Sequence, residues 1–418
     1  MKLQFLGGAQ EVGRSAVLLK GGRTQVLLDY GVLIGREPGF PSHVSSREVH
    51  AIILSHAHLD HSGAVPIFHV TTEVPVYGTQ ITQQLSKLLI TDFIHLSRYY
   101  LPYEFLDLQT MMSRYMDLEY RQPTRIRGFG IELLNSGHIP GSAQVKVEWR
   151  GKHILYTSDF NPFDTQLLNG ADQKYNDIDV LIIESTYADE EHRDRENEEQ
   201  RFITQVNRVA ESGGTILIPS FSVGRAQEIL CLLAAYNFQY PIVVDGMAIT
   251  ANDIIAENLK FVRDPALFKK ALAMTSVIRG WKDRRRATKR PGVIVSPAGM
   301  LTGGNAVFYM NTVAKKAKNG VFLVSYQVPE SPGRRLLESQ KFIINGKTRK
   351  VKAEIDQFDF TSHAGKNSLL ETVKRVDCSG PVFIVHGAEE NCRQLALAIR
   401  EAFGFEAIAP NTGEIYKT

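Results

Sequence analysis

The chain has 418 residues, of which 43% are apolar and 22% are charged, as is usual for globular proteins. This length exceeds what one compact core normally holds, so two domains are expected. The formal net charge of +3 neither requires nor excludes a nucleic-acid partner, and any basic surface must be local.

Three features predict a cytoplasmic protein. The three cysteines, an odd number without a CxxC pair, argue against a disulfide framework and favour a reducing compartment. The N-terminus begins with a strand-like run at 3–6 rather than a secretory signal. The sequence lacks any apolar run approaching the roughly 18 residues of a membrane span. We therefore expect no membrane partner.

Six short apolar runs each lead into a residue that can bind a metal or transfer a proton. Such runs predict buried strands, and we expect their ends to gather on one edge of a sheet. The runs and the residues that follow them are 25–28 with Asp29, 51–54 with the cluster at 56–61, 131–134 with His138, 153–158 with Asp159, 180–183 with Glu184, and 381–385 with His386.

The segment Ser-His-Ala-His-Leu-Asp-His at 55–61 places four metal ligands within six residues. Residues two apart on an extended backbone project to the same side, so His56 and His58 can grip one ion. Asp60 and His61, on the turn that follows, point toward a second ion. Imidazole suits zinc, and a carboxylate can bridge two cations. The simpler alternative is a solvated loop, but three of the chain's 12 histidines fall inside this segment.

The stretch 189–357 contributes none of these ligands and has an α/β pattern of its own. Strands are predicted at 215–219, 241–245, 292–296 and 321–326, with a helix around 226–233. Because ligands lie on both sides of this stretch, we expect one discontinuous domain (1–188 and 358–418) interrupted by an inserted domain (189–357). The charged segment 189–201 predicts a solvated helix start.

Two strand-to-helix turns in the insert, at 222–225 and 301–305, could present backbone N–H groups to phosphate. Such turns also occur simply because these connections need small residues. The basic run 279–290, which includes Trp281, fits a solvated face and a nucleic-acid track equally well. The candidate substrate contacts are Ser222, Arg225, Thr302, Thr361 and Ser362.

Taken together, these motifs resemble those of the metallo-β-lactamase superfamily and, within it, the β-CASP nucleases. Asp29, the cluster at 56–61, His138 and Asp159 match the four superfamily motifs. Glu184, His363 and His386 resemble β-CASP motifs A, B and C. The closest branch contains archaeal and bacterial relatives of the mRNA 3′-end cleavage nuclease, and ribonuclease J is more distant. The fold implied is an α/β metallo-β-lactamase αββα sandwich carrying an inserted α/β β-CASP domain.

The resemblance also implies two Zn²⁺ ions per chain. His56, His58 and His138 would bind one ion, and Asp60, His61 and His386 the other, with Asp159 bridging. Such a pair can stabilise the attacking and non-bridging oxygens of a phosphodiester. Asp29 is assigned to orienting a histidine. His363 would be the general acid, held by Glu184; the alternative is that these two residues form a structural pair.

The implied function is a zinc-dependent ribonuclease that hydrolyses single-stranded RNA, as an endonuclease, a 5′→3′ exonuclease or both. One alternative is a catalytically inactive RNA-binding scaffold subunit, although such a subunit is expected to have lost ligands. A small-molecule hydrolase shares the histidine cluster but not the insert. A homodimer and RNA-processing partner proteins are further expectations from the resemblance.

Overall fold

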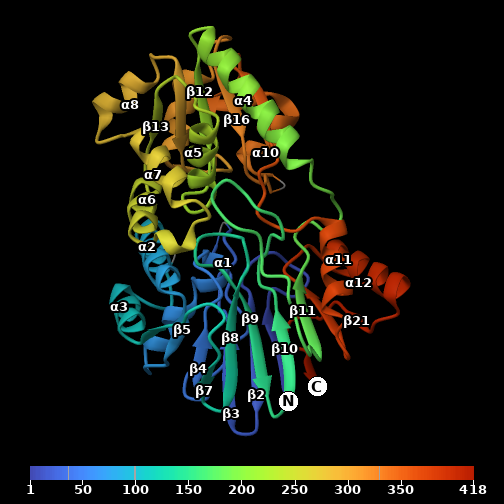
Figure 1. Ribbon diagram of the computed structural model, residues 1–418. Helices are drawn as coiled ribbons and strands as arrows, with labels where there is room; N and C mark the ends of the chain where they lie inside the picture. Colours follow the sequence, from blue (N-terminus) through green and yellow to red (C-terminus); the bar gives the residue numbers. More distant parts are fainter. Residues whose placement is uncertain (36, 98–99, 329) are drawn as a thin grey trace. The chain divides into compact units, whose positions relative to one another are not determined.

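The computed structural model describes residues 1–35, 37–97, 100–328 and 330–418 and divides into two compact units (Figure 1). Unit 1 comprises Met1–Asp164, Asn169–Glu191 and Ser362–Thr418, and unit 2 comprises Thr165–Leu168 and His192–Thr361. These limits lie within a few residues of the predicted ranges 1–188, 189–357 and 358–418, apart from Thr165–Leu168.

The short segment Thr165–Leu168 groups with unit 2 because of its hydrogen bonds. The Glu228 carboxylate accepts from the backbone N–H groups of Gln166 (3.1 Å) and Leu167 (2.8 Å). Arg263 donates from its backbone N–H to the Leu167 carbonyl at 2.8 Å and from its side chain to the Thr165 carbonyl at 2.7 Å. The sequence did not indicate this connection.

Unit 1 consists of two seven-stranded sheets and the helices that cover them. The first sheet has the order β22-β1-β2-β3-β4-β5-β6, and the second has the order β21-β20-β11-β10-β9-β8-β7. The elements are β1 (Lys2–Gly7), β2 (Ala16–Gly21), β3 (Thr24–Leu28), β4 (Ala51–Ile53), α1 (Leu59–Ser62), η1 (Val65–His69), β5 (Val76–Gly78), α2 (Gln80–Leu96), α3 (Phe105–Ser113), β6 (Tyr115–Asp117), β7 (Thr124–Ile126), β8 (Phe129–Asn135), β9 (Ala143–Trp149), β10 (Lys152–Tyr156), β11 (Val180–Glu184), α11 (Lys366–Val376), β20 (Val382–Val385), α12 (Glu389–Phe403), β21 (Ala407–Ile408) and β22 (Ile415–Lys417).

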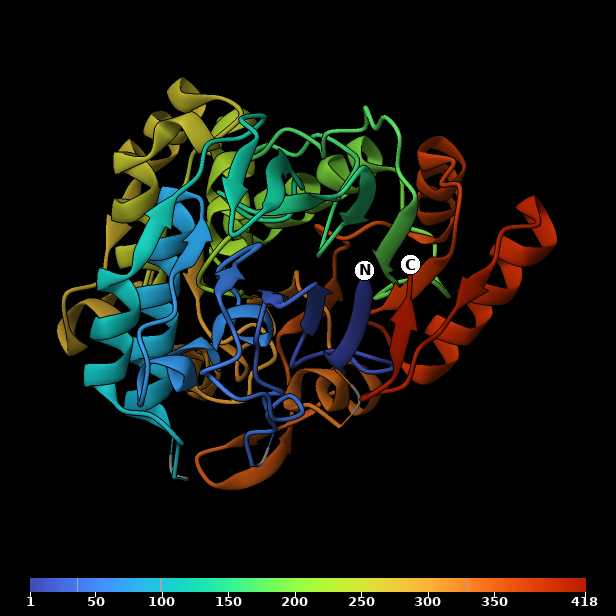
Figure 2. The same ribbon diagram turned by 90° about the horizontal axis from the view of Figure 1, so that it is seen from below.

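The main core of unit 1 lies between the two sheets, which face each other in Figure 2. Alternate residues of β1, such as Leu3 and Phe5, pack against residues of the second sheet, such as Ile131 and Phe383. The opposite faces pack on helices: α2 and α3 cover the first sheet, and α11 and α12 cover the second. Unit 1 is therefore an αββα sandwich, as predicted.

The predicted strands that lead to ligands are all present, but they do not belong to one sheet as we expected. β3 and β4 belong to the first sheet, whereas β8, β10, β11 and β20 belong to the second. Apolar runs of this kind predict burial but not the sheet that a strand joins. Within the second sheet, β10, β11 and β20 are mutually parallel, so their carboxyl ends share one edge.

Unit 2 is built on a six-stranded sheet of order β14-β13-β15-β12-β16-β19, in which every pairing is parallel. A separate antiparallel hairpin, β17-β18, lies beside the core of this unit. The elements are α4 (Arg195–Glu211), β12 (Thr215–Pro219), α5 (Arg225–Ala235), β13 (Ile242–Val244), α6 (Ala248–Glu257), η2 (Leu259–Phe261), α7 (Pro265–Ala273), β14 (Thr275–Val277), α8 (Trp281–Ala287), β15 (Gly292–Ser296), α9 (Gly304–Val313), β16 (Gly320–Leu323), α10 (Pro332–Ser339), β17 (Lys341–Ile344), β18 (Lys347–Lys350) and β19 (Glu354–Gln357).

The helix start predicted within 189–201 is that of α4, and most of this segment is exposed, as expected. The Asp194 side chain caps the helix by accepting from the Asn197 N–H at 3.0 Å. Glu198 and Glu199 are buried, and they pair with Arg201 (2.8 Å) and Arg195 (2.9 Å). A pattern of alternating charge does not reveal such pairing, so the burial of these two glutamates was not predicted.

Across the described residues, none of the helices combines the length and the apolar character that a membrane crossing demands.

Candidate metal centre

The predicted metal ligands come together in unit 1 as two groups that share Asp159. One group is His56, His58, His138 and Asp159, and the other is Asp60, His61, Asp159 and His386. Within each group the ligand atoms lie within 4.8 Å of one another. The two sets are those that the resemblance implied.

The first group is built around three imidazoles. His138 Nε2 lies 3.0 Å from His58 Nδ1, and His56 Nε2 and His138 Nε2 each lie 3.7 Å from Asp159 Oδ2. Burial lowers the pKa of His56 and His138 well below the ordinary histidine value, and it also lowers the pKa of His58. A neutral imidazole is the form that binds a metal.

In the second group, both Asp60 and Asp159 approach the imidazole of His386. His386 Nε2 lies 3.6 Å from Asp60 Oδ2 and 3.5 Å from Asp159 Oδ1, and His61 Nε2 lies 3.3 Å from Asp159 Oδ1. Burial opposes charge on His61, yet the carboxylates of Asp159 and Asp29 raise its pKa well above the usual value. Asp60 and His61 lie on the single turn α1, directly after His58.

Two buried polar atoms show that this donor set fits a divalent cation. His56 Nε2 and Asp159 Oδ1 have no hydrogen-bond partner although both side chains are buried. Burying such groups unpaired is costly unless something compensates, and a metal ion is the natural compensation for an imidazole beside a carboxylate. Five histidines and two aspartates form the donor set that zinc accepts.

The ligands are held by buried groups behind them. Asp29 Oδ2 lies 2.7 Å from His61 Nδ1 and also accepts from the hydroxyls of Ser55 (2.6 Å) and Tyr156 (3.0 Å). The Ser15 hydroxyl lies 2.7 Å from His386 Nδ1. Contacts of this kind fix the orientation of a ligand ring.

Sequence reasoning identified Asp29 but missed Ser15, Ser55 and Tyr156. Ser55 is adjacent to the histidine cluster and could have been suspected from that position. Ser15 and Tyr156 carry no spacing signal, because the fold alone brings them near residues 371 and 127 positions away.

The backbone bends sharply where several of these residues lie. Asp29, Ser158 and His386 have φ angles of 57°, 50° and 50°, in the left-handed region that most residues avoid. Strain of about 1–3 kcal/mol per residue persists only where the surroundings impose it, and it concentrates at functional sites. The chain is also tightly packed at Gly31, because a Cβ at this position would lie 1.7 Å from the Asp60 carbonyl oxygen.

His363 and Glu184 form a close pair beside the first group. His363 Nδ1 lies 3.0 Å from both carboxylate oxygens of Glu184, which is buried. Although burial opposes it, the Glu184 carboxylate raises the pKa of His363. The ring of His363 is centred 4.5 Å from that of His138. The Glu184 carboxylate therefore favours the protonated form of the His363 imidazole.

The predicted substrate contacts divide between the two units. Ser362 belongs to unit 1, and its carbonyl oxygen lies 2.8 Å from His138 Nδ1. Thr361 is the last residue of unit 2. Ser222 and Arg225 follow β12, and Thr302 follows β15, at the carboxyl edge of the parallel sheet of unit 2.

The basic run 279–290 contains α8, and its arginines have different surroundings. Arg284 forms a two-point ion pair with the buried Asp245, at 2.7 and 3.1 Å, and its guanidinium lies 5.0 Å from the centre of the Trp281 ring. Arg286 pairs with Asp283 at 3.1 Å. Arg284 therefore has a structural role, and replacing it would not test phosphate binding by this run.

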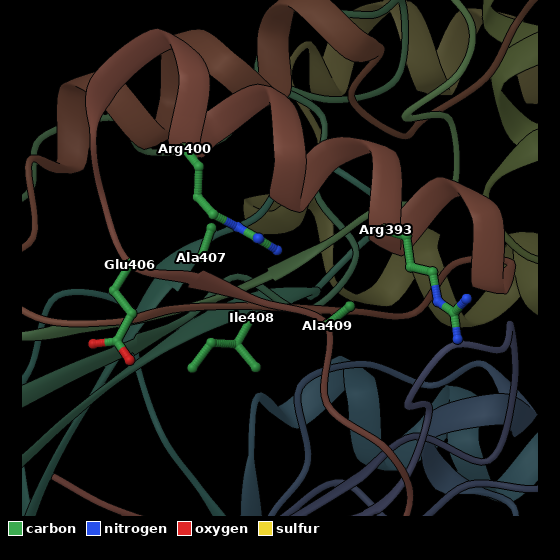
Figure 3. A pocket seen from close by; sticks show the side chains of 6 residues that line it. All are labelled: Arg393, Arg400, Glu406, Ala407, Ile408 and Ala409. Atoms are coloured by element: carbon green, nitrogen blue, oxygen red, sulfur yellow. The ribbon is translucent and has the colours of Figure 1, made fainter.

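A hollow of about 590 Å³ lies elsewhere in unit 1, between α12 and β21 (Figure 3). Arg393 and Arg400 reach it from the helix, and Glu406 reaches it from the strand side. Its lining does not include the predicted ligands, so it is separate from the metal centre.

Comparison with known proteins agrees with this architecture. Residues 18–185 match the metallo-beta-lactamase superfamily domain, 226–336 the Beta-Casp domain, and 348–410 the Zn-dependent metallo-hydrolase RNA specificity domain. A solved protein of unknown function from Enterococcus faecalis shares the fold, with a TM-score of 0.63, 14% identity and coverage of 99% of both chains.

Two archaeal relatives align along nearly the whole chain. RNase aCSPSF2 of Saccharolobus solfataricus is 41% identical over 99% of this chain and 84% of its own length. Probable RNase MJ4 of Methanocaldococcus jannaschii is 38% identical over 99% of both chains. The chain therefore belongs to the β-CASP family of metallo-β-lactamase-fold proteins.

Proposed function

We propose that this protein is a metal-dependent ribonuclease that hydrolyses phosphodiester bonds of single-stranded RNA. The observation that carries this proposal is the pair of ligand groups sharing Asp159, in a chain that also matches an RNA specificity domain. The relatives named as ribonucleases support the same activity. Within the proposal, the predicted ranges 1–188 with 358–418 and 189–357 act as the metallo-β-lactamase and β-CASP domains.

We assign two Zn²⁺ ions to the two groups. His56, His58 and His138 would hold one, Asp60, His61 and His386 the other, and Asp159 would contact both. Bound zinc ions of this kind supply an activated water at neutral pH and stabilise negative charge on phosphate oxygens. Asp29 keeps the His61 ring oriented through its 2.7 Å contact.

His363 is proposed to protonate the leaving 3′-oxygen. Glu184 holds Nδ1 of the ring, which directs Nε2 as the proton donor, and its charge favours the protonated imidazole. The alternative is that His363 and Glu184 form a structural pair. In that case a substitution would affect folding rather than the rate of RNA cleavage. The proximity of His363 to Asp159 in a third ligand group favours the catalytic role.

The alternative of an inactive RNA-binding scaffold is disfavoured because both ligand groups are complete. Endonuclease and 5′→3′ exonuclease modes both remain within the proposal, as do a cytoplasmic location, a homodimer and RNA-processing partner proteins. Among the five candidate substrate contacts, Ser222, Arg225 and Thr302 are proposed to bind phosphate at the sheet edge of unit 2, and Thr361 and Ser362 beside His363.

The test is cleavage of labelled single-stranded RNA by metal-replete protein. Wild type should cut the RNA, and elemental analysis should find about two zinc ions per chain. For Asp60→Ala, both the cleavage rate and the zinc content should be lower. Glu73→Ala, which removes an exposed acid that belongs to no ligand group, is the matched control and should behave as wild type. RNA binding without cleavage by wild type would favour the scaffold. Substrates with a 5′-phosphate and with a blocked 5′ end would separate the two modes.

A further inference from the structure

Eight exposed cations gather on one part of unit 2, which we call the basic shelf. Three follow helix α9, and five lie on or just after the hairpin β17-β18. The two segments meet because the Lys352 N–H donates to the Ala314 carbonyl at 2.8 Å. The members of the basic shelf are Lys315, Lys316, Lys318, Lys341, Lys347, Arg349, Lys350 and Lys352, all of them exposed.

The hairpin of the basic shelf is firmly anchored. Phe342 and Ile344 on β17 are buried in the core of unit 2, together with Val351 directly after β18. Asn345 and Gly346, at φ 51° and 73°, form the tight turn. The cations therefore project from a fixed support, which limits the entropy lost when they contact a ligand.

The cations of the basic shelf are not neutralised by ion pairs within the described residues. Lys341 lies directly opposite Lys350 in the hairpin register, an arrangement of like charges that is destabilising. The sequence contains no Asp or Glu between 339 and 353. Glu354, just beyond, is paired with Arg208. Among the residues that the structure describes, none of the eight cations forms an ion pair.

A shallow hollow of about 600 Å³ adjoins these cations. It is lined by residues from both segments, including Ala317, Lys350 and Lys352. Lysines on edge strands can also serve to discourage strand-to-strand aggregation. That purpose explains cations on the hairpin, but it does not explain Lys315, Lys316 and Lys318, which lie in no strand.

We propose that the basic shelf binds the phosphate backbone of single-stranded RNA, independently of base sequence. This inference rests on the proposed ribonuclease function. The phosphates of RNA supply negative charge that pairs with the cations of the shelf. Each cation that contacts a phosphate releases a counterion from the RNA. None of the shelf residues is a predicted metal ligand, so an RNA needs enough phosphates to contact both the shelf and the metal centre. The shelf should therefore strengthen binding of long RNAs more than short ones.

The experiment compares the full-length, zinc-loaded wild type with a variant carrying Lys341→Gln, Lys347→Gln, Arg349→Gln and Lys350→Gln. The control variant carries Arg23→Gln, Arg127→Gln, Arg150→Gln and Lys374→Gln, which remove the same charge from exposed positions of unit 1. Binding and kcat/KM are measured with RNAs of roughly 8 and 40 nucleotides over a range of salt. Thermal melting checks that both variants are folded.

For the shelf variant, kcat/KM on the long RNA should fall by about tenfold at low salt, with little change on the short RNA. The slope of log affinity against log salt should become shallower by roughly 0.7 for each cation that meets a phosphate. The control variant should match wild type in kcat/KM and in the salt dependence of its affinity. Equal behaviour of shelf variant and wild type on the long RNA would overturn the inference and leave an acidic protein as the partner. If wild type itself failed to cut either RNA, the ribonuclease function would be the proposal that fails.

Discussion

Asp159 of unit 1 and Asp245 of unit 2 are both buried aspartates near the carboxyl end of a parallel strand, yet they face opposite surroundings. Asp245 receives donors on both oxygens, from Arg284, Tyr309 (2.7 Å) and the Gly246 N–H (2.7 Å). Asp159 faces imidazoles, and its Oδ1 has no hydrogen-bond partner. The partners of a buried carboxylate, rather than its depth, therefore distinguish the structural ion pair of Asp245 from the predicted metal ligand Asp159.

Two other buried carboxylates, Asp29 and Glu184, combine features of Asp245 and Asp159. Each accepts hydrogen bonds from backbone or hydroxyl donors and also orients one histidine. Substituting each of the four carboxylates should therefore give a different result.

Asp159→Asn should have the largest effect, because Asp159 belongs to every ligand group. We expect RNA cleavage to fall by at least about 10³-fold, as when preorganised electrostatic stabilisation is lost. Zinc content, measured by elemental analysis after gel filtration, should fall as well. Full zinc occupancy with wild-type cleavage would show that Asp159 resembles Asp245 after all.

Asp245→Ala should instead act on stability, because it leaves Arg284 without its partner. Removing one member of a buried pair costs about 3 kcal/mol, at the low end of the usual range since the Arg284 side chain is 20% exposed. The midpoint of urea unfolding should fall while zinc content stays unchanged. Asp253→Ala, an exposed acid on α6, is the control and should cost less than about 0.5 kcal/mol.

Glu184→Gln should slow cleavage by about 10²-fold with both metals retained, as expected for loss of general-acid catalysis. Because the Glu184 carboxylate raises the pKa of His363, a neutral amide should lower that pKa. His363 then loses its proton at a lower pH, so the alkaline limb of the pH–rate profile should move to lower pH. An unshifted pH–rate profile would favour a purely structural role for Glu184 and His363.

Asp29→Asn should have the mildest effect of the four carboxylate substitutions, because Asp29 belongs to neither ligand group and contacts the predicted ligand His61 from behind. We expect zinc affinity to weaken by about tenfold, measured by competition with a chelator. Tyr156→Phe removes only one hydrogen bond to Asp29 and should weaken affinity less. A larger loss for Tyr156→Phe than for Asp29→Asn would contradict this order.

The candidate metal ligands could be predicted from the sequence because their signals are local. The ligand types and their spacing at 56–61 lie within one short segment. Each further predicted ligand follows an apolar run, and these runs form strands as their hydrophobic pattern predicted. The inserted α/β pattern was equally local, and the strands at 215–219 and 292–296 were predicted with their observed limits.

Only the tertiary structure decided which polar residues meet. It divided the ligand-bearing strands between two sheets, brought Ser15 to His386, paired Arg284 with Asp245, and joined Lys315–Lys318 to a hairpin distant in sequence. The physical reason is that hydrophobic patterning fixes burial along one element, whereas contacts between elements depend on register and packing that no local pattern encodes.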